Sequence, residues 1–446
     1  MMSRRRFLQV SAGLGLVAGL RRLRIAQASD YRALVCVFMF GGNDGHNLIV
    51  PLNGTQYSAY QSARGALALP SAQLLPINEP TLGPFALHYA LPELQALFTQ
   101  GKLAIVANTG VLAQPTAFRN LSDPNFQLPL NLRSHSDQVV MMQTGFSNAG
   151  GSSGWGGRTL DGLQAYNGAT SFPVSISMDS PAIYCVGAVT QNVTLEPNND
   201  LDQSAFSIYP PAAAQARAAA QRQIVTTDSG NAMVNAANQV MANAINLNPV
   251  LKSAGAGATF PKAFPANTLG DQLEEIARIV SLNGQLGVGR QVFFCGLGGF
   301  DTHGGQPYQQ WDLLQQASKA LDAFYAALAA WGMDSQVTVF TMSDFGRTLQ
   351  PSGSGTDHGW GNHHLILGGA VNGGRIYGRF PLMTNYANFN ALADDYADTR
   401  GTMLPSTSLA QYGATLARWF GATETQLAAI FPQLATFATK DLGFFS

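Results

Sequence analysis

The residues with the clearest chemical potential are aspartates and histidines in the segment 291–369. This segment holds four of the seven histidines. Two apolar runs inside it, 291–295 and 337–342, are typical of buried strands. Asp301 follows the first run, and Asp344 follows the second. Carboxylates and imidazoles that meet are ligands of hard or borderline divalent metals, so the segment predicts a metal site.

A third aspartate follows another apolar run near the start of the chain. Residues 31–40 are typical of a central buried strand and lead through two glycines to Asp44. Ligands of open α/β sheets gather at the carboxyl ends of parallel strands. We therefore expect Asp44, Asp301 and Asp344 at one edge of a sheet. An Asx turn is the simpler role for Asp44 taken alone.

The elements between these residues favour an α/β fold. A long helical pattern, 306–331, separates the runs 291–295 and 337–342, which predicts one βαβ unit with parallel strands. From about 160 to 265 the chain changes character and offers no chemistry. We interpret this part as a helical and β insertion, packed over one side of the sheet, in a single domain that spans 29–446.

A second polar cluster, 132–138, contains candidate nucleophiles. It precedes an apolar run, as the start of a helix does. A helix N-terminus favours negative charge, so a nucleophilic hydroxyl or an oxyanion is well placed there. Ser134 and Ser136 supply the hydroxyls. The alternative is a serine that only caps the helix beside an exposed histidine.

Composition limits the range of partners. Charged residues make up 11% of the 446 residues, and the formal net charge is −1. This balance gives no argument for nucleic acid or an anionic membrane as a partner. Cys36, Cys185 and Cys295 are odd in number and far apart, so we expect buried small side chains and no disulfide scaffold.

The N-terminus predicts export. Residues 3–8 read SRRRFL, a twin-arginine signature, and residues 26–28 read AQA, a cleavage site. The apolar stretch 10–20 is too short to span a bilayer, so no stable membrane span is expected. We expect a signal peptide at 1–28, the twin-arginine export machinery as a partner, and a periplasmic or extracellular protein.

Several ordered motifs together resemble one known family. They are the twin-arginine signal, GGNDG, RSH, GGFDTHGGQ, SDFGRT and GTDHGWGNHH. They are similar, over nearly the whole mature chain, to the exported bacterial family called domain of unknown function 1501. That family is grouped with the alkaline phosphatase and sulfatase superfamily. The resemblance implies an alkaline-phosphatase-like mixed sheet sandwiched between helices and, in active members, a metal site.

The resemblance also implies roles for individual residues. Ser134, or else Ser136, matches the hydroxyl nucleophile at a helix start. The metal ligands that the resemblance implies are Asp44, Asp301, His303, Asp344 and a final histidine, where His358 fits and His363 or His364 is possible. Apart from the resemblance, a guanidinium matches the oxygens of a phosphate or sulfate, so Arg133, Arg158 and Arg347 are candidate clamps, with Arg347 the first choice because it closely follows Asp344.

One departure from the superfamily pattern matters. Phe345 follows Asp344, where the pattern has a histidine. A single metal in place of two, a substitute ligand such as His363, His364 or Asp357, and the loss of hydrolysis all stay open.

Taken with the resemblance, these features predict an exported metal-dependent hydrolase that acts on phosphate or sulfate esters through a serine nucleophile. The expected cofactor is a divalent ion, Zn²⁺, Mn²⁺, Mg²⁺ or Ca²⁺, and the expected substrate is a small-molecule or polymer ester. The alternative is a non-catalytic binding or assembly protein that retains the fold.

Overall fold

The structure, a computed structural model, describes most of residues 30–446. The residues left out within this range are 149, 169, 171, 198–209, 236, 240, 243, 244, 246–248, 250–257, 388–393 and 446. The predicted signal peptide, 1–28, lies outside the described residues.

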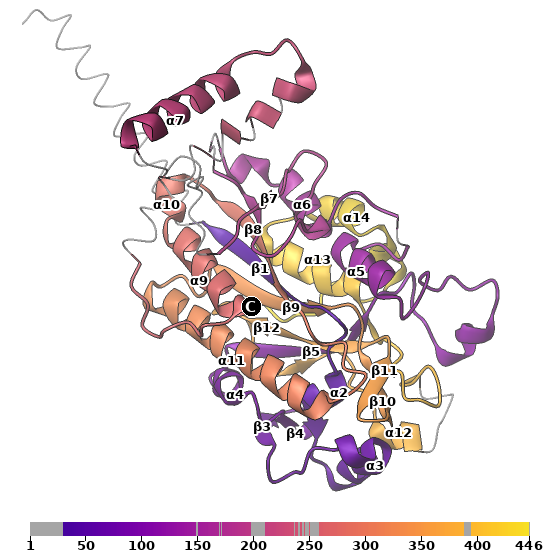
Figure 1. Ribbon diagram of the computed structural model, residues 1–446. Coiled ribbons are helices and arrows are strands. Elements are labelled where there is room, and N and C mark those ends of the chain that lie inside the picture. Colours follow the sequence, from indigo (N-terminus) through magenta and orange to yellow (C-terminus); the bar gives the residue numbers. More distant parts are fainter. Residues whose placement is uncertain are drawn as a thin grey trace, which may run out of the picture.

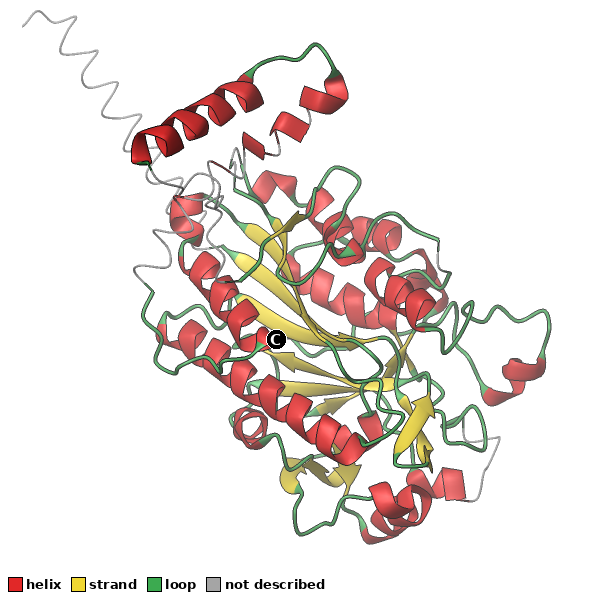
Figure 2. Ribbon diagram, in the orientation of Figure 1, coloured by secondary structure: helices red, strands yellow, loops and turns green. Residues whose placement is uncertain are grey.

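A mixed sheet forms the middle layer of the molecule (Figures 1 and 2). Its strand order is β13 (Ile376–Tyr377), β5 (Leu103–Gly110), β12 (Asn362–Leu367), β9 (Val337–Ser343), β1 (Arg32–Met39), β8 (Arg290–Leu297), β6 (Ser175–Ser177) and β7 (Val193–Thr194), and β14 (Thr407–Ser408) also pairs with β5. β12 runs antiparallel to both β5 and β9, and the other described pairs of this sheet are parallel.

The central strands are apolar throughout because both faces of the sheet are covered. Successive side chains of a strand point to opposite faces. In β1, Val35 and Val37 therefore join one core cluster, while Cys36 and Phe38 join the other. All four side chains are fully buried.

Helices supply the two outer layers (Figure 2). One core cluster includes side chains of α4 (Pro92–Thr99), α9 (Thr268–Ser281) and α11 (Gln306–Ala330). The other includes side chains of α5 (His135–Thr144), α6 (Trp155–Asp161), α13 (Leu409–Phe420) and α14 (Glu424–Ile430). This arrangement confirms the predicted sheet between layers of helices.

Two smaller sheets lie outside the main one. β2 (Ile49–Pro51), β4 (Gly83–Leu87) and β3 (Leu75–Glu79) form one, and β10 (Arg347–Ser352) pairs with β11 (Gly355–His358) in the other. The remaining described α-helices that carry labels are α2 (Gly45–Leu48), α3 (Gly54–Arg64), α7 (Pro211–Thr226), α10 (Asn283–Leu286) and α12 (Met383–Ala387).

The predicted insertion, 160–265, has two kinds of structure in its described residues. β6 and β7 extend the main sheet beyond β8. α7 has no buried residue and stands away from the sheet (Figure 1). None of the helices in the described part of the chain is long and apolar enough to cross a membrane.

Candidate metal centre

The loops that follow three parallel strands meet at one edge of the sheet. β1 lies between β8 and β9 and is parallel to both, so the carboxyl ends of all three open on the same side. The β10–β11 hairpin brings Arg347 opposite His358 at this edge. His135 enters it at the start of α5.

Three side chains converge there. His135, Asp301 and His358 each present one ligand atom, and these atoms lie within 4.8 Å of one another. The Nε2 atoms of His135 and His358 are 3.1 Å apart. The Oδ1 atom of Asp301 lies 3.4 Å from the His135 Nε2 and 3.3 Å from the His358 Nε2.

The hydrogen bonds of the two imidazoles determine which nitrogen carries a proton. His135 Nδ1 lies 2.6 Å from the buried Asp344 carboxylate, and His358 Nδ1 lies 2.7 Å from the carbonyl oxygen of Arg133. Both partners accept hydrogen bonds, so each Nδ1 carries the hydrogen. In the neutral imidazoles, the lone pairs then sit on Nε2 and face each other and Asp301.

This donor set fits a divalent cation. Two lone pairs and a carboxylate oxygen repel one another unless a proton or a cation lies between them. Ligands about 2.0–2.1 Å from a tetrahedral zinc ion lie about 3.3–3.4 Å apart, close to the separations found here. A second carboxylate or carbonyl that holds the other ring nitrogen is also typical of metal-binding histidines.

His303 borders this group. Its Nε2 lies 2.9 Å from the His358 Nε2 and 3.1 Å from the Asp301 Oδ1. Its Nδ1 is 3.7 Å from the Asp357 carboxylate, and about half of the side chain is exposed. His303 can therefore donate a hydrogen to this group or turn to supply a further ligand.

Local charges tune the two carboxylates differently. Burial raises the pKa of Asp344 above its ordinary value, although its contact with His135 opposes the rise. Burial also opposes ionisation of Asp301, but the hydrogen bond and charge of Arg347, together with His135 and His303, outweigh it and lower the pKa of Asp301. Burial lowers the pKa of His358, which keeps its imidazole neutral and able to bind a cation.

Arg347 links the backbone segments that meet at this edge. Its side chain is fully buried and donates to Asp301 Oδ1 at 2.5 Å. It also donates to the carbonyl oxygens of Gly41, Gly42, Phe300 and Thr356. These bonds tie the three loops together and leave Arg347 little capacity to hold a substrate oxygen.

Asp44 lies outside the converging group. Its carboxylate pairs with Arg64 of α3 and accepts from Gln306 of α11, and its other oxygen accepts the backbone N–H of His46. The side chain is almost completely buried. Asp44 thus joins α3 and α11 to the turn after β1.

His363 also lies outside the converging group. Its Nδ1 accepts the backbone N–H of Asn108 at 3.0 Å, so its hydrogen sits on Nε2 and neither nitrogen offers a free lone pair. Its ring stacks on Phe380, while the next residue, His364, stacks on Tyr412. We leave both histidines out of the ligand set.

The serines lie at the N-terminal end of α5. Ser134 precedes the helix, between Arg133 and His135, and its hydroxyl donates to Asp137 at 2.6 Å. The Ser134 and Ser136 hydroxyl oxygens are 3.2 Å apart. His135 was not among the predicted metal ligands, although it stands between the two serines at a helix start, where a polar side chain faces the sheet edge.

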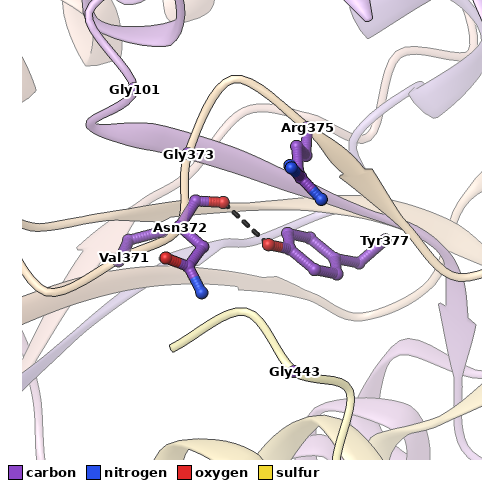
Figure 3. Close-up of a pocket in the computed structure, with 7 residues that line it drawn as sticks. All are labelled: Gly101, Val371, Asn372, Gly373, Arg375, Tyr377 and Gly443. Carbon is purple, nitrogen blue, oxygen red and sulfur yellow. Dashed lines mark hydrogen bonds between the residues drawn. The ribbon is translucent and has the colours of Figure 1, made fainter. Parts of the chain in front are cut away.

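A hollow of about 440 Å³ lies elsewhere (Figure 3). Gly101, Asn372, Arg375 and Tyr377 are among its lining residues. Gly101 precedes β5, whose far end reaches the metal-centre edge, so the hollow lies at the opposite edge of the sheet. Its described lining residues include no histidine, aspartate or glutamate, and we do not assign the chemistry to it.

Comparisons with known proteins give a family and no activity. The sequence model of the family described as "Protein of unknown function (DUF1501)" matches residues 31–427. None of the curated proteins matches. Among solved structures, the PsFucS1 sulfatase from Pseudoalteromonas sp. is 10% identical, covers 92% of this chain and 71% of its own, and has a TM-score of 0.36. The C-terminal periplasmic domain of EcEptC from Escherichia coli, in complex with Zn, is 12% identical, covers 76% and 73%, and has a TM-score of 0.27. These TM-scores are too low to carry an argument.

Proposed function

We propose a function from the site itself, because the chain belongs to the family of proteins of unknown function DUF1501, whose description names no activity. The proposal is a metal-dependent hydrolase that acts on phosphate or sulfate esters. The choice of these esters is supported by the motifs that resemble the alkaline phosphatase and sulfatase superfamily.

The observation that carries the proposal is the convergence of His135, Asp301 and His358. Three protein ligands are typical of catalytic zinc sites, which keep one position open. The side chains of these residues are 34%, 47% and 23% exposed, so solvent and substrate can reach them. A divalent ion bound there would act as a Lewis acid on an ester oxygen.

Ser134 is the nucleophile that we propose. It sits at the N-terminus of α5, where developing negative charge on its oxygen is favoured. Its hydroxyl donates to Asp137, so this carboxylate can take the proton when the oxygen attacks the phosphorus or sulfur atom and the bond to the alcohol oxygen of the ester breaks. Asp344 and the Arg133 carbonyl hold the two imidazoles in the required tautomers.

A panel of aryl phosphates and aryl sulfates, assayed with Zn²⁺, Mn²⁺, Mg²⁺ or Ca²⁺, tests the proposal. We expect Ser134→Ala to lower kcat at least 100-fold. Ser136→Ala tests the alternative nucleophile, and a loss of activity in this variant alone would assign the role to Ser136. A protein that binds a metal tightly but turns over none of these esters would favour the binding or assembly alternative.

We also propose export through the twin-arginine machinery to the periplasm or beyond. Its support is the SRRRFL and AQA motifs, which lie outside the described residues. Replacing Arg4 and Arg5 by Lys should leave the precursor in the cytoplasm, as measured by cell fractionation. Normal delivery of that double variant would contradict this route.

A further inference from the structure

Two exposed arginines lie beside the metal centre. The side chains of Arg133 and Arg400 are 47% and 42% exposed. The carbonyl of Arg133 holds His358, and the guanidinium of Arg400 pairs with Asp357, the residue before His358. Each arginine is therefore tied to a ligand histidine or its neighbour.

A single turn holds both arginines in place. One oxygen of Asp398 pairs with the Arg133 guanidinium. The other accepts the backbone N–H of Arg400 at 2.9 Å and that of Thr402 at 3.2 Å. Arg133 and Asp398 are 265 residues apart in the chain, so this carboxylate joins two distant segments.

Both guanidinium groups have donors to spare. Each pairs with its carboxylate through Nη2, and neither Nη1 donates to any residue that the structure describes. The Nε of Arg400 is buried without an acceptor among the residues that the structure describes. Arg158, by contrast, donates to the carbonyls of Ser153, Thr144 and Ile430 and is committed to the backbone.

We propose that Arg133 and Arg400 form a clamp for the anionic group of the substrate, which makes a sulfate or phosphate monoester the substrate class. This inference rests on the proposed hydrolase function. A guanidinium presents paired N–H groups that match two oxygens of a phosphate or sulfate. Asp398 holds Arg133 and the backbone of Arg400 in position, and Asp357 competes with the anion for the Arg400 guanidinium.

Anion affinity tests the clamp without any need for turnover. The zinc-treated protein is titrated calorimetrically with inorganic phosphate and with sulfate, and its zinc content is measured. We expect Arg400→Gln and Arg133→Gln each to raise the dissociation constant about tenfold, or about 1.4 kcal/mol, with zinc content unchanged. Arg418→Gln is the matched control, because Arg418 also pairs with a carboxylate, Glu424, but lies on α13.

Asp357→Asn gives an effect of opposite sign. Removing the carboxylate that competes for Arg400 should lower the dissociation constant for phosphate and sulfate. A misfolded variant would not bind these anions more tightly. Failure of the wild-type protein to bind either anion, or unchanged affinity in both arginine variants, overturns the clamp and leaves the metal centre standing. If the protein binds no zinc, the hydrolase proposal is overturned. The same titrations of the metal-free protein then test the clamp alone, and a tenfold lower anion affinity in the arginine variants would support it.

Discussion

The position of two hydrogens decides the chemistry of the metal centre. Asp344 and the Arg133 carbonyl hold a hydrogen on the Nδ1 atoms of His135 and His358, which directs both Nε2 lone pairs at Asp301. Groups outside the ligand set that fix ligand tautomers in this way affect affinity as well as orientation.

Asp344→Asn should therefore weaken zinc binding by about 10- to 100-fold. The amide oxygen can still accept the backbone N–H of Gly41, but its NH₂ group then faces His135 Nδ1. That contact favours the other tautomer, which puts the hydrogen on the Nε2 that should bind zinc. Competition with a zinc-binding dye measures the affinity, with the partly exposed Asp334→Asn as control. An unchanged affinity would show that Asp344 does not set the tautomer.

The sequence indicated some of these residues and not others. Asp301, His303 and His358 lie in polar motifs after apolar runs, so their meeting at one edge follows from parallel strands. His135 comes from a distant helix start, 209 residues before Asp344 in the chain. No rule of sequence spacing connects it with the other ligands. The orientations of Asp44 and His363 depend on Arg64 and Asn108, contacts that pattern alone does not reveal.

Among the elements, the turn after β1 leaves no room for a side chain at Gly41. Gly41 has φ +111°, and a Cβ atom there would lie 2.3 Å from the backbone nitrogen of Asp301. Its N–H also donates to Asp344. The close approach of the turns after β1 and β8 places Asp301 within reach of the histidines.

Gly41→Ala should lower the free energy of unfolding by at least about 1–3 kcal/mol, the cost of such a backbone conformation for a residue with a side chain. It should also weaken zinc binding, because Asp301 must shift. Urea unfolding and zinc titration measure the two effects. Gly54→Ala is the control, since nothing lies within 4 Å of a Cβ atom at that position. If the two variants have the same free energy of unfolding and the same zinc affinity, this turn does not have the proposed role.

β12 carries two buried histidines that should make the fold sensitive to acid. Burial lowers the pKa of His364 to about 3, against 6.5 for an ordinary histidine. The unfolded chain therefore takes up a proton below about pH 6.5 that the folded chain refuses, so stability falls as the pH falls from about 6.5 towards 3. At pH 5 this histidine alone costs about 2 kcal/mol. His364→Phe, which keeps a ring on Tyr412, should lose that much less stability between pH 7.5 and pH 5. Urea unfolding with a chelator present measures the difference, and an equal loss in both proteins would refute the assignment.

For the whole molecule, the hydrophobic pattern predicted an α/β fold with parallel strands, and the mixed sheet between helices was implied by the family resemblance. Apolar runs separated by a long helical pattern predict parallel strands covered on both faces, as β8, α11 and β9 show. Pattern could not predict that β12 runs antiparallel between β9 and β5, because that direction depends on the β10–β11 hairpin before it. Nor could it predict that β6 and β7, inside the predicted insertion, extend the main sheet.

Metal binding should be visible in the stability of the whole molecule. A cation that binds only the folded chain stabilises it by RT ln(1 + [L]/Kd), about 2.7 kcal/mol at 100 times Kd. Treatment with a chelator should therefore lower the melting temperature, and added Zn²⁺ should restore it. Asp301→Asn removes one ligand, so the drop caused by the chelator should shrink, because less bound metal is left to remove.

Asp357→Asn is the control, since Asp357 lies beside His303 but outside the three-ligand group, and it should keep the full drop. If neither the chelator nor added Zn²⁺, Mn²⁺, Mg²⁺ or Ca²⁺ changes the melting temperature, the basis for a metal-dependent hydrolase is removed. A binding or assembly role would then account better for the fold.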